Sequence, residues 1–291
     1  MPIPAATVPD AIAVAAEVAR EFGLALSEPV PLRSTNNAVA WLRPLDVVAK
    51  VSVARDSRLH TELQVAQQLH SLGAAVVPPA SDLPCTVHSR GGLQMTFWRY
   101  FAQPPFTALP HDQVARALMQ LHAALSRLTS SLKTKLPSYM GELTYVRSLL
   151  TDEPALPAFT AADRVLLLKT FDLLLARLEE LVPTHKLVPI HGAPHSYNVL
   201  LVGGEPVFID FETVCIGPVE WDLAHLDFQV EAAYPELIQS ELLWLCRGMV
   251  SVKVATLCAA DIDRGDMREH AEWHLAHVKD QVVPNLRRPT P

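Results

Sequence analysis

The pattern of apolar and polar positions divides the chain into a strand-rich first part and a helix-rich second part. Residues 9–22 have the period of an amphipathic helix, with Gly23 at a stop position. Short apolar runs at 30–33, 38–42 and 47–53 follow, separated by polar or proline-containing turns. These three runs predict a small antiparallel meander.

A second helix and a hairpin complete the first part. Asp56 or Ser57 can cap a helix that runs to Leu72, because its apolar residues recur at helical spacing. Two further runs, 85–88 and 93–97, flank a Gly-Gly pair that is typical of a hairpin turn. We therefore expect five strands and one inserted helix in a first lobe.

Beyond a proline-rich stretch at 101–110, helical patterns dominate. They cover residues 111–128, about 139–150, and 161–181. The pattern returns to strands at 199–202 and 206–210, and helices then resume to about residue 282. The change in pattern predicts two domains. Residues 1–100 would form an N-terminal helix and a β-rich lobe, and residues 101–291 a helical lobe.

Composition excludes some classes of protein. Of the 291 residues, 49% are hydrophobic and 19% charged, which is enough apolar material for a real core. The formal net charge of −7 argues against a nucleic-acid partner, because binding to a phosphate backbone needs clustered Lys and Arg. An acidic surface would tolerate a cationic substrate, although solubility explains the charge equally well.

Cysteine usage and hydropathy predict a soluble cytoplasmic protein without a membrane partner. The four cysteines are scattered singly, with neither a CxxC pair nor a disulfide-like spacing, so we expect reduced core residues. The first eight residues lack a basic region followed by an apolar run, which disfavours a signal peptide. Charges interrupt apolar stretches such as 165–181, so no segment is expected to span a bilayer.

The segment HGAPHSYN at 191–198, followed by FIDFE at 208–212, is the most informative part of the sequence. A loop and a short hairpin could bring the Asn198 amide oxygen and the Asp210 carboxylate to one divalent ion. Such oxygen ligands suit Mg²⁺ that bridges nucleotide phosphates. The alternative is a zinc site on His191 and His195, which have the four-residue spacing of metalloprotease helices. Gly192 disfavours it, as do Pro194 and the missing Glu.

These residues resemble the aminoglycoside phosphotransferase and choline kinase-like family, relatives of protein kinases, whose loop reads HGDxHxxN before an ID[WF]E segment. The stretch GPVEWDLA at 217–224 is similar to a second block of that family. The resemblance covers about residues 30–226. It implies an α+β, two-lobed protein-kinase-like fold with a small antiparallel β lobe and a larger helical lobe. It also implies an ATP- or GTP-dependent phosphotransferase that acts on a hydroxyl of a small molecule.

The same resemblance assigns roles to residues of both lobes. Lys50, on a predicted strand, would contact the nucleotide phosphates, and Glu62, twelve residues later in a predicted helix, would pair with it. Asn198 and Asp210 would ligate Mg²⁺. His191 would brace the catalytic loop, which Asp222 would support from the following helix. All of these role assignments follow from the resemblance, and spacing alone does not establish them.

The resemblance also places the nucleotide. Residues 97–101 would form the hinge between the lobes, so Phe97, Trp98 and Tyr100 are expected near the nucleobase. The turn at 34–37, which includes Asn36, would lie over the phosphates. That turn contains no glycine, unlike loops that cradle phosphates through their backbone.

The family's catalytic Asp is replaced by Ala193. A methyl group cannot accept a proton, so the usual general base is absent. Positioned acid–base catalysis contributes ~10²–10⁴-fold, and phosphoryl transfer depends mostly on alignment and charge neutralisation, so slow turnover could survive. Three alternatives stay open. His195, or else Glu212, could act as base; the protein could bind nucleotide without turnover, like a pseudokinase; or Ala193 could be an introduced substitution.

Three histidines recur at helical spacing near the C-terminus: His270, His274 and His277. A metal or substrate face is one interpretation, and a solvated or groove-lining face is the more common one. The tryptophans of the second part, Trp221, Trp244 and Trp273, are expected in its core. The identity of the acceptor and the oligomeric state do not follow from the sequence, because selectivity depends on tertiary placement.

Overall fold

The computed structural model shows two compact units. The described residues are 3, 7–34, 37–53, 58–103, 109–152, 156, 158–182, 186–234 and 238–286. One unit comprises Met1–Leu136, Ala193–Val214 and Ala232–Tyr234, and the other comprises Pro137–Gly192, Cys215–Glu231 and Pro235–Pro291. The boundaries of these units differ from those of the predicted lobes 1–100 and 101–291, because each unit is assembled from segments that are distant in sequence. The lobe boundary at residue 100 stays a prediction.

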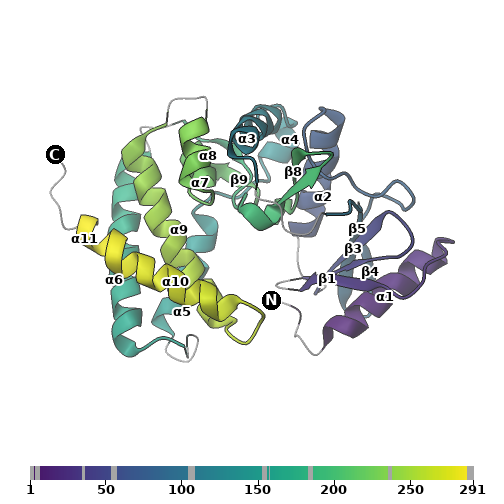
Figure 1. The fold of residues 1–291 in the computed structure, drawn as a ribbon, viewed down its shortest axis with the longest axis horizontal. Coiled ribbons are helices and arrows are strands. Elements are labelled where there is room, and N and C mark those ends of the chain that lie inside the picture. The colour runs from purple at the N-terminus through teal and green to yellow at the C-terminus, as the bar shows by residue number, and fades with distance from the viewer. Residues whose placement is uncertain are drawn as a thin grey trace. The chain divides into compact units, whose positions relative to one another are not determined.

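The first unit contains a five-stranded antiparallel sheet in the order β1-β2-β3-β5-β4 (Figure 1). Its strands are β1 (Val30–Ser34), β2 (Ala38–Trp41), β3 (Val47–Val53), β4 (His88–Arg90) and β5 (Leu93–Arg99). The predicted strand at 85–88 is wrong at its start. The Thr86 backbone N–H donates to the Pro84 carbonyl, which turns the chain, and pairing begins only with His88 opposite Met95.

Two helices pack on this sheet. The first, α1 (Val8–Glu21), lies against β2 and β3. Its buried face includes four alanines, whose small side chains let the helix approach the strands closely. The second, α2 (Arg58–Ser71), packs against β5 and buries Leu59, Leu63 and Leu69. The predicted caps of α2, Asp56 and Ser57, lie outside the described residues.

A hairpin and a helix from later in the sequence belong to the same unit. The hairpin joins β7 (Val199–Val202) to β8 (Glu205–Phe208) through two glycines with positive φ, as tight hairpin turns require. It packs against α3 (His111–Leu125), which is followed by the short α4 (Ser130–Lys133). The strand β8 ends two residues earlier than predicted, because Asp210 has φ 67° and leaves the extended conformation.

The second unit is mainly helical, with α9 (Ser240–Ala260) in contact with the other long helices. Those are α5 (Gly141–Thr151), α6 (Ala161–Leu181) and α10 (Met267–His277). A π-helix, Val278–Val282, and α11 (Val283–Leu286) follow α10. Two short helices, α7 (Val219–Leu223) and α8 (Phe228–Ala233), precede α9.

A two-stranded sheet also belongs to the second unit. It pairs β6 (Val188–Ile190) with β9 (Cys215–Gly217). The apolar pattern did not predict β9, because its three residues are too few to show a period and their partner is distant in sequence. Pairing places the residue before His191 next to the segment that leads into α7.

Within the described residues, α9 is the helix whose length and mean hydropathy of 1.5 would allow it to cross a membrane. Length and composition do not distinguish a membrane span from a core helix. In this structure 78% of the apolar stretch is buried, which is the environment of a core helix.

Candidate functional site

The β7–β8 hairpin brings Asn198 and Asp210 together. Val199 pairs with Phe208, so the residue before β7 lies opposite the residues that follow β8. The Ile209 N–H donates to the Asn198 carbonyl at 3.0 Å, which extends this pairing by one step. Asp210 then adopts the left-handed conformation, which Asp tolerates better than most residues.

Lys50 lies at the centre of a buried ionic cluster in the first unit. Its position on β3, opposite Val39 and Thr96, fixes the backbone. Its ammonium nitrogen lies 2.8 and 2.9 Å from the two carboxylate oxygens of Glu62 on α2. It also lies 2.9 Å from Asp210 Oδ1 and 2.8 Å from Glu212 Oε1. Four of the residues singled out in the sequence are therefore in contact.

This cluster has more negative than positive groups, because one ammonium faces three carboxylates. Burial lowers the pKa of Lys50, but Asp210, Glu62 and Glu212 outweigh it and hold that pKa well above its usual value. Burial is also the largest cause that raises the pKa of Glu62, to about 8; Lys50 opposes this, and the two other carboxylates add to it. The cluster can therefore accept further positive charge.

The donor atoms of the cluster fit a hard divalent cation. The carboxylate oxygens of Glu62, Asp210 and Glu212 lie within 4.8 Å of one another. The amide nitrogen of Asn198 donates to the Ala193 carbonyl at 3.0 Å, so its amide oxygen is the atom left to act as a ligand. The predicted ligands Asn198 and Asp210 lie on neighbouring segments of the hairpin, and their role in binding Mg²⁺ stays a prediction.

The backbone that enters the catalytic loop is held within the second unit. The fully buried Asp222 accepts the N–H of His191 at 2.8 Å and the N–H of Gly192 at 2.7 Å, one with each oxygen. The indole of Trp221 donates to the Gly192 carbonyl at 3.1 Å. The N–H and the carbonyl of Gly192 are therefore both hydrogen-bonded, immediately before the chain reaches Ala193.

A buried lysine lies beneath this support. Lys253 of α9 is 5.5 Å from the centre of the Trp221 ring and 2.8 Å from a carboxylate oxygen of Glu142. Nothing in the sequence pattern predicted this contact, because a lysine in a helix is usually solvated. Its 5% exposure shows that it is part of the core.

The comparison with protein families is decisive for the class of this chain. The model of the phosphotransferase enzyme family matches residues 31–243, which is most of the chain and includes the Lys50 cluster and the loop at 191–198. This chain belongs to the phosphotransferase enzyme family. A search of the curated proteins found no match.

Solved structures confirm the predicted α+β, protein-kinase-like fold. A spectinomycin phosphotransferase in complex with ADP and spectinomycin is 16% identical, with a TM-score of 0.67 over 96% of this chain and 95% of that one. An amicoumacin kinase with AMP-PNP and Ca²⁺ is 12% identical, with a TM-score of 0.70 over 91% and 93%. A choline/ethanolamine kinase family protein from Mesorhizobium loti is 16% identical, with a TM-score of 0.63 over 94% and 95%.

The loop at 191–198 is hydrogen-bonded on both sides of Ala193. Asp222 holds the residue before Ala193, and Asn198 holds the Ala193 carbonyl itself. His195 Nε2 lies 3.3 Å from the Asn198 amide nitrogen, so His195 belongs to the same loop structure. Ala193 therefore lies in a loop whose backbone is held by its own hydrogen bonds and does not depend on a carboxylate at this position.

Glu212, the second predicted base, has two strong contacts. Besides Lys50, its Oε1 accepts the amide N–H of Asn37 at 2.6 Å. The predicted phosphate-turn residue Asn36 lies outside the described residues, so its role stays a prediction. Sequence reasoning marked this turn but missed Asn37. The contact of Asn37 with Glu212 joins residues 175 positions apart in the sequence, so a local pattern could not indicate it.

The three residues predicted near the nucleobase have partners in the first unit. The buried Phe97 accepts the Ala80 N–H at 2.9 Å through its carbonyl, and the Trp98 indole donates to Thr96 Oγ1 at 2.9 Å. The Tyr100 ring stacks on Trp41, with centroids 4.2 Å apart and planes 10° apart. Their role at the nucleobase stays a prediction.

Proposed function

We propose that this protein transfers the γ-phosphoryl group of ATP or GTP to a hydroxyl group of a small molecule. The observation that carries the proposal is the contact of Lys50 with Glu62 and Asp210 in one buried cluster. Such a lysine, held by a helical glutamate beside a metal-binding aspartate, is the arrangement that phosphoryl-transfer enzymes use to hold nucleotide phosphates.

The described residues divide the chemistry among them. Lys50 would bind the phosphates, and Asn198 with Asp210 would hold Mg²⁺, which supplies charge neutralisation for the phosphates. In the reaction the acceptor oxygen forms a bond to the γ-phosphorus, the bond from that phosphorus to the β-phosphate bridging oxygen breaks, and the hydroxyl proton leaves. The excess negative charge of the cluster supports a cation there.

The destination of the hydroxyl proton is the part of the reaction that Ala193 affects. Ala193 cannot accept it, and Glu212 is engaged by Lys50 and Asn37. His195 is then the best placed base, because it lies on the same loop and contacts Asn198. Loss of the acid by itself would slow turnover by about 10²–10⁴-fold without abolishing it, since alignment and charge neutralisation persist.

A second function, nucleotide binding without turnover, is favoured by Ala193 alone. The two functions differ in product and share the binding site. We therefore pair ³¹P NMR, which detects a phosphorylated acceptor, with calorimetric titration of Mg²⁺-ATP and Mg²⁺-GTP. A panel of small hydroxylated acceptors, cationic and neutral, addresses the acceptor class.

Three variants make this experiment decisive. Asp210→Asn should abolish both nucleotide binding and turnover, whereas Lys169→Met, on an exposed face of α6, should change neither. Ala193→Asp should raise turnover by about 10²-fold or more if only the carboxylate is missing. Binding without product in both the natural chain and Ala193→Asp would support the binding function. Unchanged titrations for Asp210→Asn would refute both functions.

A further inference from the structure

Gly192 is the residue through which the chain reaches Ala193. It has φ 90°, in the left-handed region that glycine adopts at little cost, and a glycine backbone is also the least restricted. The direction in which the chain leaves Gly192 is therefore not fixed by the residue itself. It depends on the groups that hold the two peptides on either side of Gly192.

Two side chains hold Gly192, and they act on different peptides. Asp222 accepts the Gly192 N–H, which belongs to the peptide between His191 and Gly192. The Trp221 indole donates to the Gly192 carbonyl at 3.1 Å, and this carbonyl belongs to the peptide between Gly192 and Ala193. Asp222 therefore fixes the chain up to Gly192, whereas Trp221 acts on the peptide that follows.

The hydrogen bond from Trp221 is buried. The Trp221 side chain is 2% exposed, and Gly192 is buried as well. A buried carbonyl that loses its donor keeps the cost of its desolvation, because water does not readily replace the lost partner. Loss of the indole N–H should therefore loosen the peptide between Gly192 and Ala193.

The indole is itself held by two side chains. The ammonium of Lys253 lies 5.5 Å from the centre of the Trp221 ring, close enough for a cation–π interaction, and 2.8 Å from a carboxylate oxygen of Glu142. The Tyr139 ring meets the indole edge to face, with centroids 5.0 Å and planes 63° apart. The indole N–H cannot turn away from Gly192 without disturbing both contacts.

A glycine of β9 admits the tyrosine to this position. A Cβ atom at Gly217 would lie 2.7 Å from Ile190 Cδ1 and 3.0 Å from Tyr139 Cβ. The Tyr139 N–H also donates to the Ile216 carbonyl at 2.9 Å, which ties the tyrosine to the same strand. Gly217 therefore allows the end of β6 and the ring that packs on Trp221 to approach each other closely.

We propose that Trp221 is a positioning residue of the catalytic loop: its indole N–H holds the peptide between Gly192 and Ala193, and Lys253 holds the indole. Its effect on turnover rests on the proposed function, because the course of the loop beyond Ala193 matters there for phosphoryl transfer. Its effect on the order of this peptide does not depend on that function.

Trp221→Phe isolates the hydrogen bond, because it keeps an aromatic ring against Lys253 and removes the indole N–H. The measurement is ¹⁵N relaxation of the full-length protein. The Ala193 N–H lies on the loosened peptide, so its order parameter should fall from about 0.85, typical of rigid backbone, to about 0.7 or lower. The Gly192 N–H, held by Asp222, should change less, and Val252 of α9 should not change. A purely structural role of Trp221 would lower stability without this local loss of order.

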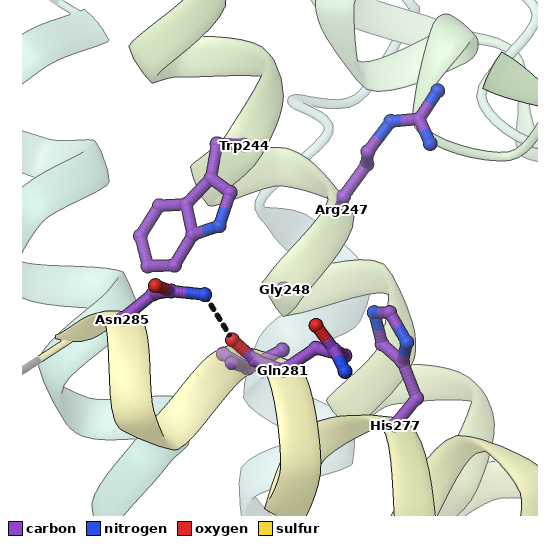
Figure 2. Close-up of a pocket in the computed structure, with 7 residues that line it drawn as sticks. Trp244, Arg247, Gly248, His277, Gln281 and Asn285 are labelled. Atoms are coloured by element: carbon purple, nitrogen blue, oxygen red, sulfur yellow. Dashed lines mark hydrogen bonds between the residues drawn. The ribbon is translucent and has the colours of Figure 1, made fainter.

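Trp244 provides a matched control in the same unit (Figure 2). Its indole lines a pocket together with Arg247, Gly248 and His277, away from the contacts of Gly192. Trp244→Phe also removes an indole N–H, and it should leave the order parameter of Ala193 unchanged.

Lys253→Met tests the hold on the indole, and it serves as the second variant if Trp221→Phe does not fold. It should lower the order parameter of Ala193 by a smaller amount, because methionine can still pack on the ring. Combined with Trp221→Phe, it should cause no further loss, since Lys253 acts through the indole N–H.

Kinetics complete the test. In the natural chain or Ala193→Asp, whichever turns over nucleotide, adding Trp221→Phe should lower kcat about 10-fold and leave the KM for Mg²⁺-ATP unchanged. If no chain turns over, the proposed function fails and the order parameters alone decide. An unchanged order parameter at Ala193, an equal loss at Val252, or an unchanged kcat in an active chain would each overturn the proposal.

Discussion

Two lysines of this protein are buried to the same degree, and their surroundings differ in charge. Lys50 of the first unit is 7% exposed and contacts three carboxylates. Lys253 of the second unit is 5% exposed and contacts one carboxylate, Glu142, and the face of Trp221. Burial alone therefore does not indicate function. Excess negative charge around Lys50 suits a site that receives a metal and phosphates, whereas the balanced charge around Lys253 suits a structural support.

The largest expected effect is that of Lys50→Met. It leaves three carboxylates without their cation, so the free energy of unfolding at pH 8 should fall by about 3–5 kcal/mol. Urea unfolding measures this, and Lys50→Met with Glu62→Gln should recover part of the loss because one buried charge is removed. If the single variant were as stable as the natural chain, the carboxylates would not depend on Lys50, and the contrast with Lys253 would fail.

The next largest effect on the free energy of unfolding concerns the ion pair of Lys253 and Glu142. Removing one partner should cost more than removing the other. Glu142→Gln leaves a buried ammonium without its carboxylate and should cost about 2–3 kcal/mol. Lys253→Met should cost only about 1 kcal/mol, because the methionine can pack on Trp221 and the freed Glu142 carboxylate, 37% exposed, can hydrate. Thermal unfolding of both variants measures the order. The reverse order would show that Lys253 contributes mainly through Trp221.

The smallest effect concerns His274, a partly buried histidine whose pKa is shifted by burial and by two other histidines rather than by a carboxylate. Burial, then His277 and His270, lower the pKa of His274 to about 4. In the unfolded chain this histidine binds its proton near pH 6.5, so between pH 6.5 and 4 the unfolded state holds more protons. Stability should therefore fall by about 1–2 kcal/mol as pH decreases through that window, allowing for partial exposure.

Substitution isolates this contribution. His274→Gln should flatten the decrease in unfolding free energy between pH 6.5 and 4, whereas the exposed His60→Gln should leave it unchanged. Urea unfolding across this pH range is the measurement. An unchanged pH profile for His274→Gln would mean that its imidazole becomes charged as easily in the folded chain as in the unfolded one.

Local patterns predicted the long helices and most strands, because each is longer than one period of its own type. The helix at 161–181 was predicted to its end residues. Thr160 caps its start and forms a capping box with Asp163. Short segments with distant partners were harder. The strand at 215–217 was missed, and the strand predicted at 85 begins only at His88, because pairing and turns set those boundaries.

For the candidate site, the sequence supplied residue types and their order along the chain. Lys50, Glu62, Asn198 and Asp210 were all singled out, and the structure brings the two acids to Lys50 and places Asn198 beside the Asp210 segment. The contact of Asn37 with Glu212 was missed, as were the Trp221–Lys253 pair and the pocket at Gly248. Each of these depends on which side of a strand or helix meets a partner distant in sequence.

By itself, the sequence determined the long helices, most of the strands and the absence of an acid at position 193, and its motifs predicted the kinase-like fold, since these depend on periodicity, residue identity and motif. Only the tertiary structure decided how the charges are distributed. It placed three carboxylates on one buried lysine and one carboxylate on the other. The physical reason is that interaction between charges depends on distance and on exclusion of water, and both are fixed only when segments distant in sequence pack together.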